Sequence, residues 1–317
     1  MPEGKRVVLT GATGELGTAL APALMANGYD LVVFARDLDA AQRKLPGAAA
    51  YARWEIGLDG DWKQLLDGAY GVINCAGANM FARRYTKAYA RVCAESRILG
   101  ARALVDALRA AGRRPEVFIN TASQGYYGLT DFDDRPLDES APPGLDKWGQ
   151  ESAPIDAEPF AAQTLGVRVV SVRAGYVLDC RGGGLPLMVA QVLKGQGAAT
   201  TPVTAWRSWI HIDDLVAMYL WALADPRVNG GLNGTAPNPV TSANFANALS
   251  LAVTGQPTTR RFPGFLLRLF MGPAATVITH GKRIIPRKAQ DLGFQFTFPT
   301  LEQALADLVP KIKPRPV

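Results

Sequence analysis

The chain has 317 residues, 48% of them hydrophobic, so it can bury a substantial core in one large or two modest domains. No apolar run reaches the length that spans a bilayer, and the first residues carry neither a secretory nor a transit signal. The chain carries a net charge of +6, and these features predict a globular protein that does not bind a membrane. Its three scattered cysteines predict a reduced, cytoplasmic setting.

The cysteines and the charge distribution exclude further classes. Cys75, Cys93 and Cys180 are scattered and odd in number, which fits neither a disulfide framework nor a zinc site, so we expect no metal. The segment from Pro237 onward contains ten Lys or Arg and only three acidic residues. This basic segment either attracts an acidic small ligand or forms a solvated surface. Its basic residues lack interleaved aromatic side chains, so no nucleic-acid partner is expected.

The first half of the chain alternates β-branched runs with helical patterns. Strands are expected at 5–10, 30–36, 71–77, 116–123 and 167–175, and helices at 15–28, 40–45, 84–111 and 157–166. In the long helix Tyr85, Ala88, Val92 and Leu99 are expected to form a core-facing stripe. The alternation predicts an α/β fold, a doubly wound parallel sheet of the Rossmann type.

Beyond Gly175 this rhythm ends. Glycine-rich loops, helices near 185–195 and 301–309, and the segment 207–223 predict a smaller, mostly helical region over the ligand edge of the sheet. Within RSWIHIDDL, alternation places Trp209 and His211 on one face of a short strand, so we interpret His211 as structural, although it titrates near neutrality. Asp213 and Asp214 are expected as the N-cap and first turn of the next helix.

The sequence GATGELG, residues 11–17, follows a strand at once and opens a helix. In that context Gly11 permits a tight turn, Gly14 lets the backbone approach a diphosphate, and Gly17 lets the helix pack closely on the strand. The N-terminus of the helix then attracts the phosphates. This pattern predicts a dinucleotide cofactor.

Arg36 closes the second strand. An acidic residue there would bind the 2′-hydroxyl of a ribose, whereas the planar guanidinium favours a 2′-phosphate, so the cofactor is expected to be NADP(H). In the alternative, Arg36 pairs only with Asp37 or solvent and a neighbour contacts the ribose. The expected cofactor-binding residues are Gly11, Thr13, Gly14, Glu15, Leu16, Gly17, Arg36, Cys75, Ala76, Gly77, Thr121 and Gly175.

We therefore expect an NADP-binding domain at 1–175, to which the segment of about 206–235 returns, and a substrate-binding cap region at 176–317. The GGG at 182–184 permits a mobile lid, or only a flexible loop.

Four motifs occur in a recognisable order, namely GATGELG, NCAGAN, TASQGYYG and RSWIHIDDL. As a set they resemble the extended short-chain dehydrogenases/reductases. More narrowly, the stretches 82–99, 182–188, 261–272 and 284–305 resemble the atypical branch called "epimerase family protein", whose members carry a C-terminal extension. The resemblance implies a Rossmann domain, NADP(H) and a helical substrate cap, with homodimerisation through the long helix by analogy.

The same resemblance exposes a gap in the catalytic residues. Ser123 matches the serine that holds the substrate carbonyl, but the expected Tyr-x-x-x-Lys pair is missing. Counting without gaps places Trp148 at the tyrosine and Ser152 at the lysine, and a shifted register places Gln150 and Pro154 there. An indole donates a hydrogen bond but cannot serve as a general acid.

Tyr127, in the same loop as Ser123, is therefore the expected proton donor, with Tyr126 beside it; the alternative is that both phenols pack under the cap. Arg83, Arg84 and Arg97 either clamp an anionic substrate or form a solvated helix face.

The leading hypothesis is an NADP(H)-dependent oxidoreductase that acts on a small carbonyl or alcohol, with Ser123 and Tyr127 as catalytic residues. A non-catalytic NADP(H)-binding redox sensor is the alternative. Sugar-nucleotide epimerisation ranks third because no base for it is visible in the sequence.

Overall fold

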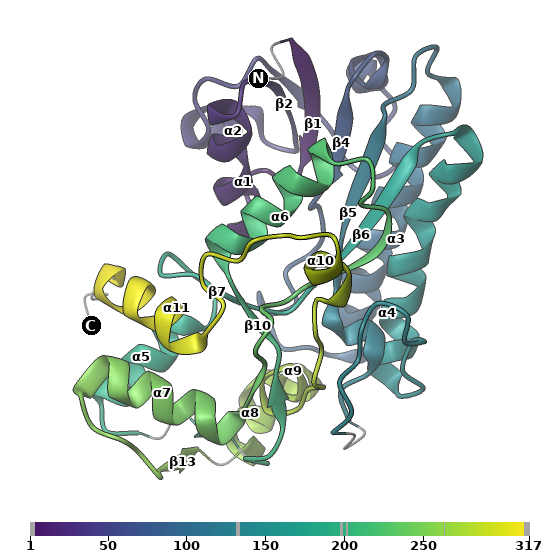
Figure 1. Cartoon of the computed structure of the whole chain (residues 1–317). Helices are drawn as coiled ribbons and strands as arrows, with labels where there is room; N and C mark the ends of the chain where they lie inside the picture. The colour runs from purple at the N-terminus through teal and green to yellow at the C-terminus, as the bar shows by residue number, and fades with distance from the viewer. Residues whose placement is uncertain (1–3, 131–133, 197–198, 201, 263, 314–317) are drawn as a thin grey trace.

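The computed structural model describes residues 4–130, 134–196, 199–200, 202–262 and 264–313. At its centre lies a parallel seven-stranded sheet in the order β11-β6-β5-β4-β1-β2-β3 (Figure 1). Its strands are β1 (Lys5–Thr10), β2 (Tyr29–Ala35), β3 (Ala50–Arg53), β4 (Gly71–Asn74), β5 (Val117–Ser123), β6 (Arg168–Ala174) and β11 (Gly230–Gly234). The predicted Rossmann-type α/β fold is confirmed.

Helices cover both faces of the sheet because alternate strand residues point to opposite sides. Val7 and Leu9 of β1 belong to one buried cluster and Val8 to the other. The first cluster lies under α1 (Glu15–Ala26) and α6 (Ile212–Ala224), and the second under α3 (Lys87–Ala110) and the 3₁₀ helices η1 (Asp61–Leu66) and η3 (Glu158–Leu165). α2 (Leu38–Lys44) connects β2 to β3.

The edge strand β11 is shielded by side chains rather than by another strand. The carboxylate of Glu139 accepts hydrogen bonds from the backbone N–H of Asn233 at 3.0 Å and of Lys288 at 3.1 Å. The Lys288 ammonium donates to the carbonyl of Gly231 at 2.5 Å. Backbone groups of this edge are thus satisfied within the chain, which disfavours pairing with another strand.

The cap region packs around its own core below the sheet in Figure 1. Trp209 and Phe245, both fully buried, join α5 (Leu185–Leu193), α7 (Ser242–Thr254) and α11 (Leu301–Leu308). The other elements after Gly175 are β7 (Tyr176–Leu178), β8 (Ala199–Thr200), β9 (Trp206–Arg207), β10 (Trp209–His211), β12 (Val240–Thr241), β13 (Arg261–Phe262), α8 (Gly264–Met271), η4 (Gly272–Ala274), α9 (Ala275–Thr279), α10 (Arg287–Asp291) and η5 (Val309–Lys311). Of these, β9 and β10 belong to the segment of about 206–235 that was expected to return to the first domain, and Ala289 of α10 belongs to the buried cluster under α1 and α6. Residues 314–317 of the expected cap region lie outside the described residues.

The long helix differs from the prediction in its start and in its buried face. It begins at Lys87, with the Thr86 hydroxyl as N-cap, so Tyr85 precedes it. Val92 and Leu99 are 43% and 39% exposed, and Ala88 is exposed too. Two apolar stripes lie side by side on this helix, and the one that faces the core contains Tyr89, Cys93, Gly100, Leu104 and Leu108.

Three helical segments lie between β5 and the next strand, β6. α4 (Lys147–Ala157), which the sequence did not predict, begins where the carboxylate of Asp146 accepts the N–H of Gly149 at 2.9 Å. The stretch expected as a helix at 157–166 is the 3₁₀ helix η3, and a short 3₁₀ turn, η2 (Gln124–Tyr127), directly follows β5.

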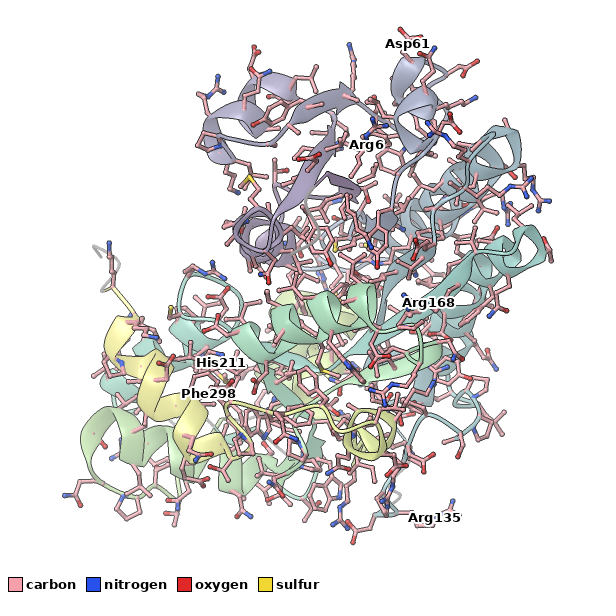
Figure 2. The ribbon with its side chains drawn as sticks, turned by 45° about the horizontal axis from the view of Figure 1, so that its top comes forward. Arg6, Asp61, Arg135, Arg168, His211 and Phe298 are labelled. Atoms are coloured by element: carbon pink, nitrogen blue, oxygen red, sulfur yellow. The ribbon has the colours of Figure 1, made fainter. Side chains whose placement is uncertain are left out.

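His211 has a structural role, and it corrects the predicted N-cap of α6. Its Nδ1 accepts the N–H of Asp213 at 3.0 Å, so His211 is the N-cap and both aspartates lie in the first turn. Its ring stacks on Phe298 with centroids 3.8 Å apart, as the labelled side chains show (Figure 2). The carboxylate of Asp214 accepts the N–H of Thr297 at 2.8 Å and of Phe298 at 3.0 Å. These contacts fasten the C-terminal segment to α6.

Candidate functional site

The sheet reverses its direction of winding between β1 and β4. β1 lies between β2 and β4, so the segments that follow these strands open on one crevice at their carboxyl ends. In open α/β sheets ligands bind at this switch point. The turn of residues 11–17 follows β1 and the sequence Cys75-Ala76-Gly77 follows β4, so the structure brings these predicted site residues together.

Two glycines of the first turn are required by close packing. Gly11 has φ +64°, and a Cβ there would lie 2.5 Å from the carbonyl carbon of Cys75. A Cβ on Gly17 would lie 2.3 Å from the carbonyl oxygen of Gly11. A Cβ on Gly14 would meet only that same oxygen, at 3.2 Å, and is otherwise surrounded by open space. Gly14 is also the N-cap of α1, and no described side chain caps it, so the first N–H groups of α1 face this space.

Three basic side chains belong to the segments next to the carboxyl end of β2, those of Arg36, Lys44 and Arg53. Arg36 is exposed, and among the described residues its guanidinium has no hydrogen-bond or ion-pair partner. Asp37 does not pair with it, because its carboxylate accepts the N–H of Ala40 at 2.9 Å as the N-cap of α2. The Lys44 ammonium donates to the carbonyl of Thr13 at 2.6 Å. Arg53, which the sequence reasoning missed, ends β3 opposite Ala35.

A buried chain of polar side chains holds the strand ends together. The Thr10 hydroxyl donates to the Asn74 carbonyl oxygen at 2.6 Å, and the Asn74 amide donates to the side chain of Asn120 at 2.7 Å. Asn74 also accepts the N–H of Ala76 at 3.3 Å. This network links β1, β4 and β5 beneath the crevice, and no motif in the sequence reasoning indicated it.

The hydroxyl of Thr121 joins Cys75 to a tyrosine of α6 below the crevice. The Thr121 hydroxyl lies 2.7 Å from the phenol oxygen of Tyr219 and 3.2 Å from the sulfur of Cys75. Burial raises the pKa of the Cys75 thiol to about 12, so this thiol stays protonated near neutral pH. Gly175 is required by packing, since a Cβ there would lie 2.5 Å from the carbonyl oxygen of Ser208.

A cavity of about 180 Å³ opens at the carboxyl end of β5. It is lined by residues of β5, α3, α4 and the segment before α3. Its polar and aromatic residues include Tyr85, Arg97, Ser123, Trp148, Glu151 and Ser152. Ser123 therefore lies in a pocket, as a residue that binds a substrate oxygen must.

Two serine hydroxyls flank Gly125 in this pocket. A Cβ on Gly125 would lie 2.8 Å from the Ser152 Oγ and 3.4 Å from the Ser123 Oγ. The Ser123 Oγ accepts the N–H of Gly125 at 3.1 Å, which leaves its own O–H available as a donor. Glycine at 125 thus allows both hydroxyls to reach the same space.

The residues of the two registers considered for the missing pair differ in where they lie. Trp148 and Ser152 line the pocket, one turn apart on α4, whereas Gln150 and Pro154 are exposed. Only the ungapped count thus names residues that face this cavity.

A phenol from another segment reaches this pocket. Tyr85 stacks on Trp148 with ring centroids 5.8 Å apart and an interplanar angle of 18°. Burial and the nearby carboxylate of Glu151 raise the pKa of Tyr85 to about 12. The sequence reasoning assigned Tyr85 only to a core stripe and missed it as a pocket residue. Its place in the stretch 82–99, which supported the family resemblance, was the available signal.

Tyr127 lies outside this pocket, and its contacts argue against the expected role as proton donor. Its hydroxyl donates to the Asn233 side chain at 2.7 Å and accepts from the Arg173 guanidinium at 2.8 Å. The residue is only 2% exposed, and burial raises the pKa of its phenol. Tyr126 packs its ring against the same guanidinium, 3.6 Å from the ring centroid. This structure does not place the Tyr127 hydroxyl beside Ser123, because η2 turns Tyr127 toward Asn233 of β11 instead of the cavity.

Of the three arginines considered for an anion, the structure places one in the pocket. Arg97 lines it, and its Nη1 donates to the carbonyls of Ala78 at 3.1 Å and Cys93 at 2.8 Å. Arg83 is exposed and lies over the Tyr89 ring at 4.1 Å, and Arg84 is exposed near Gly272.

The glycine loop 182–184 touches the dinucleotide-type turn. The N–H of Gly183 donates to the Glu15 carboxylate at 3.2 Å, at the first residue of α1. The loop thus lies beside the N-terminus of α1.

A glycine turn at the switch point, an uncapped helix N-terminus and an adjoining polar pocket define a dinucleotide-binding α/β protein of the extended short-chain type. The chain belongs to the NAD dependent epimerase/dehydratase family, whose profile matches residues 7–233. Residues 262–308 match a domain of unknown function, DUF1731. The predicted membership and the C-terminal extension are thereby confirmed.

Relatives carry the branch name that the sequence suggested. A chloroplastic epimerase family protein SDR39U1 homolog of Arabidopsis thaliana is 32% identical over 94% of this chain and 85% of its own length. An epimerase family protein of Staphylococcus saprophyticus is 31% identical over 96% of this chain and 99% of its own. The crystal structure of human epimerase family protein SDR39U1 with NADPH superposes with a TM-score of 0.81 at 27% identity and covers 96% of this chain and 99% of the human one.

Within the described part of the chain, no helix combines the length and the apolar character needed to cross a bilayer.

Proposed function

We propose that this protein is an NADP(H)-dependent oxidoreductase that acts on a small carbonyl compound or the corresponding alcohol. The observation that carries the proposal is the pocket at the end of β5, where the hydroxyls of Ser123 and Ser152 and the phenol of Tyr85 line one cavity. Such a set can hold a substrate oxygen and supply a proton to it.

The cofactor assignment rests on the crevice beside that pocket. The open space at Gly14 and the uncapped start of α1 fit a diphosphate, and Arg36 with its neighbours Arg53 and Lys44 fits an additional 2′-phosphate. The human relative of known structure holds NADPH, which supports the same choice here. NADPH, when bound, supplies a hydride to the substrate carbon.

The chain's own residues would then manage the oxygen and the proton. Ser123 donates its O–H to the carbonyl oxygen, because its Oγ already accepts from Gly125. Tyr85 gives its proton to that oxygen as the alkoxide forms, and its phenolate is reprotonated from solvent. With a pKa of about 12, Tyr85 is protonated at neutral pH and suited to reduction, whereas alcohol oxidation requires high pH to form the phenolate base.

Steady-state oxidation of NADPH against a panel of small aldehydes and ketones tests the proposal. We expect turnover of at least one substrate, and we expect Ser123→Ala and Tyr85→Phe to lower kcat by roughly 100-fold or more while NADPH affinity changes less than about twofold. The control is Tyr127→Phe, which alters a phenol outside the pocket and retains activity. Absence of turnover across the panel, or full activity in Tyr85→Phe, contradicts the proposal.

A redox sensor remains the second candidate because of one observation. The ungapped count places Ser152 where the superfamily has its lysine, and the pKa of Tyr85 is raised to about 12 by burial and Glu151 although Arg97 lies nearby. A sensor must bind NADPH and NADP⁺ with different affinities, since a ligand shifts a conformational equilibrium only through differential binding. Calorimetry that shows equal affinities, together with turnover, eliminates it.

A further inference from the structure

Arg97 is a cation in the wall of the proposed substrate pocket that no carboxylate of the described chain pairs with. Its Nη1 donates hydrogen bonds to the backbone carbonyls of Ala78 and Cys93, and the guanidinium also interacts with the thiol of Cys93. These contacts anchor the guanidinium in the pocket wall without neutralising its charge.

The position of Arg97 is set by the fold. A Cβ on Gly77 would lie 2.9 Å from the Arg97 Cζ, so the absence of a side chain at Gly77 makes room for the guanidinium. The two carbonyl contacts come from the segment after β4 and from α3 itself, so the side chain is held from two sides. A long side chain fixed in this way loses little further freedom when it binds a ligand.

The energetics favour an anion at this position. Burial lowers the pKa of Arg97, which shows that its surroundings penalise the charge. A desolvated cation gains most from a ligand that carries the opposite charge, and a guanidinium fork matches the two oxygens of a carboxylate or the oxygens of a phosphate. The other charged group of the pocket is Glu151, which lies beside Tyr85.

We propose that Arg97 binds a carboxylate or phosphate group of the substrate, so that the protein acts on an anionic carbonyl compound or alcohol. This inference rests on the proposed function, because it specifies the substrate class for the same pocket. Ser123 would hold the reacting oxygen and Arg97 the anionic group. The pocket volume of about 180 Å³ limits such a substrate to a small molecule.

A diphosphate of the cofactor is the other anion that Arg97 could meet, since Gly77 follows the strand next to β1. The two sources differ in what a substitution changes. If Arg97 holds the substrate, its loss weakens binding of small anions to the cofactor-saturated protein. If it holds the cofactor, its loss weakens binding of NADPH itself.

The test is calorimetric titration of the NADP⁺-saturated protein with oxalate and, separately, with inorganic phosphate. We expect wild type to bind at least one of these anions, and Arg97→Gln to bind it at least roughly tenfold more weakly, with Arg97→Lys in between because the ammonium retains charge but not the fork. The matched control is Arg91→Gln on the same helix, whose side chain is exposed and pairs with Glu95. We expect Arg91→Gln to bind the anion as wild type does.

A second variant covers the case in which Arg97→Gln fails to fold. Glu151→Gln leaves Arg97 in place and removes the negative charge from the pocket, so anion affinity should rise, by roughly threefold or more. Failure of wild type to bind either anion, unchanged binding in Arg97→Gln, or a tenfold loss of NADPH affinity in that variant with anion binding intact overturns the inference. Absence of turnover alongside Arg97-dependent anion binding counts against the oxidoreductase and leaves the anion site standing.

Discussion

Tyr85 and Trp148 stack face to face in the pocket, one from the segment before α3 and one from the first turn of α4. Trp148 occupies the position at which the superfamily's tyrosine is expected from the sequence. Its ring packs against Tyr85, a tyrosine from another segment. The pocket therefore contains a phenol although position 148 is a tryptophan.

The stack itself can be tested apart from the chemistry. Trp148→Ala removes a side chain that is 8% exposed, and we expect it to lower the free energy of unfolding by about 3–5 kcal/mol. Trp148→Phe keeps an aromatic face for Tyr85 and should cost about half of that or less. Urea unfolding followed by circular dichroism measures both, and equal losses in the two variants would show that Tyr85 does not depend on the stack.

Tyr127 should matter for stability. Tyr127→Phe removes a buried hydroxyl bonded to Asn233 and Arg173, so we expect a loss of about 1–2 kcal/mol in the free energy of unfolding. NADPH binding should stay within about twofold of wild type because the residue does not line the pocket. A stability equal to wild type with lost activity would restore Tyr127 as a proton donor.

The ion pair between Arg173 and Asp156 holds α4 against β6. Its side chains are 6% and 5% exposed and joined at 2.9 Å, and Asp156 also accepts from the Ser171 hydroxyl at 2.7 Å. Asp156→Ala leaves the guanidinium buried without its carboxylate, and we expect a loss of about 3–5 kcal/mol. The exposed pair of Arg91 and Glu95 serves as control, where Glu95→Ala should cost no more than about 0.5 kcal/mol. Similar losses at the two sites, measured by urea unfolding, would contradict this.

Arg36 should discriminate between the two nicotinamide cofactors. We expect Arg36→Ala to weaken NADPH binding by roughly 10- to 100-fold and to leave NADH binding nearly unchanged, because the lost contact is to the 2′-phosphate alone. The Lys44 contact to Thr13 remains, so the glycine turn keeps its shape. Fluorescence titration with each cofactor gives the ratio, and a parallel loss for both would show that Arg36 supports the fold instead.

The sequence predicted the fold class and the places of β1, β2, β4, β5 and β6 because the relevant signals are local: alternating β-branched runs and the glycine turn define strands and a crossover helix within a few residues. The short strands β3 and β11 and the helix α4 carry no such local signal and were not located. The buried stripe of α3 was misjudged because Val92 and Cys93 are neighbours on adjacent apolar faces, and tertiary packing decides which face is covered.

The pocket could be predicted only in part, because its members are far apart in the chain. Ser123 and Trp148 were found by their spacing in the sequence. Tyr85 lies in the segment before α3 and meets them only because the fold packs that segment against α4. Tyr127 was misplaced because spacing says nothing of the direction in which η2 turns its side chains. The network of Thr10, Asn74 and Asn120 joins three strands and has no local signature.

Asp146 makes the stability of the segment that holds Trp148 depend on pH. Burial alone would raise the pKa of its carboxyl, but hydrogen bonds from the N–H groups of Gly149, Leu129 and Thr130 outweigh burial and lower the pKa to about 2. These bonds start α4 and fasten the loop after η2 to it, so they hold Trp148 in the pocket.

Because the folded pKa lies below the unfolded value of about 3.9, Asp146 stabilises the folded state above pH 4, and this contribution is lost as the pH falls toward 2. With screening by solvent allowed for, we expect it to amount to about 1–2 kcal/mol. Other carboxyls, such as Asp225, titrate in the same range, so the measured quantity is the difference between wild type and Asp146→Asn in urea unfolding at pH 5, 4 and 3. The variant should be less stable at pH 5, and the gap should narrow as the pH falls, because protonation of Asp146 in the unfolded wild type then favours unfolding. A gap that stays constant from pH 5 to 3 would mean that the carboxylate charge of Asp146 does not carry these hydrogen bonds.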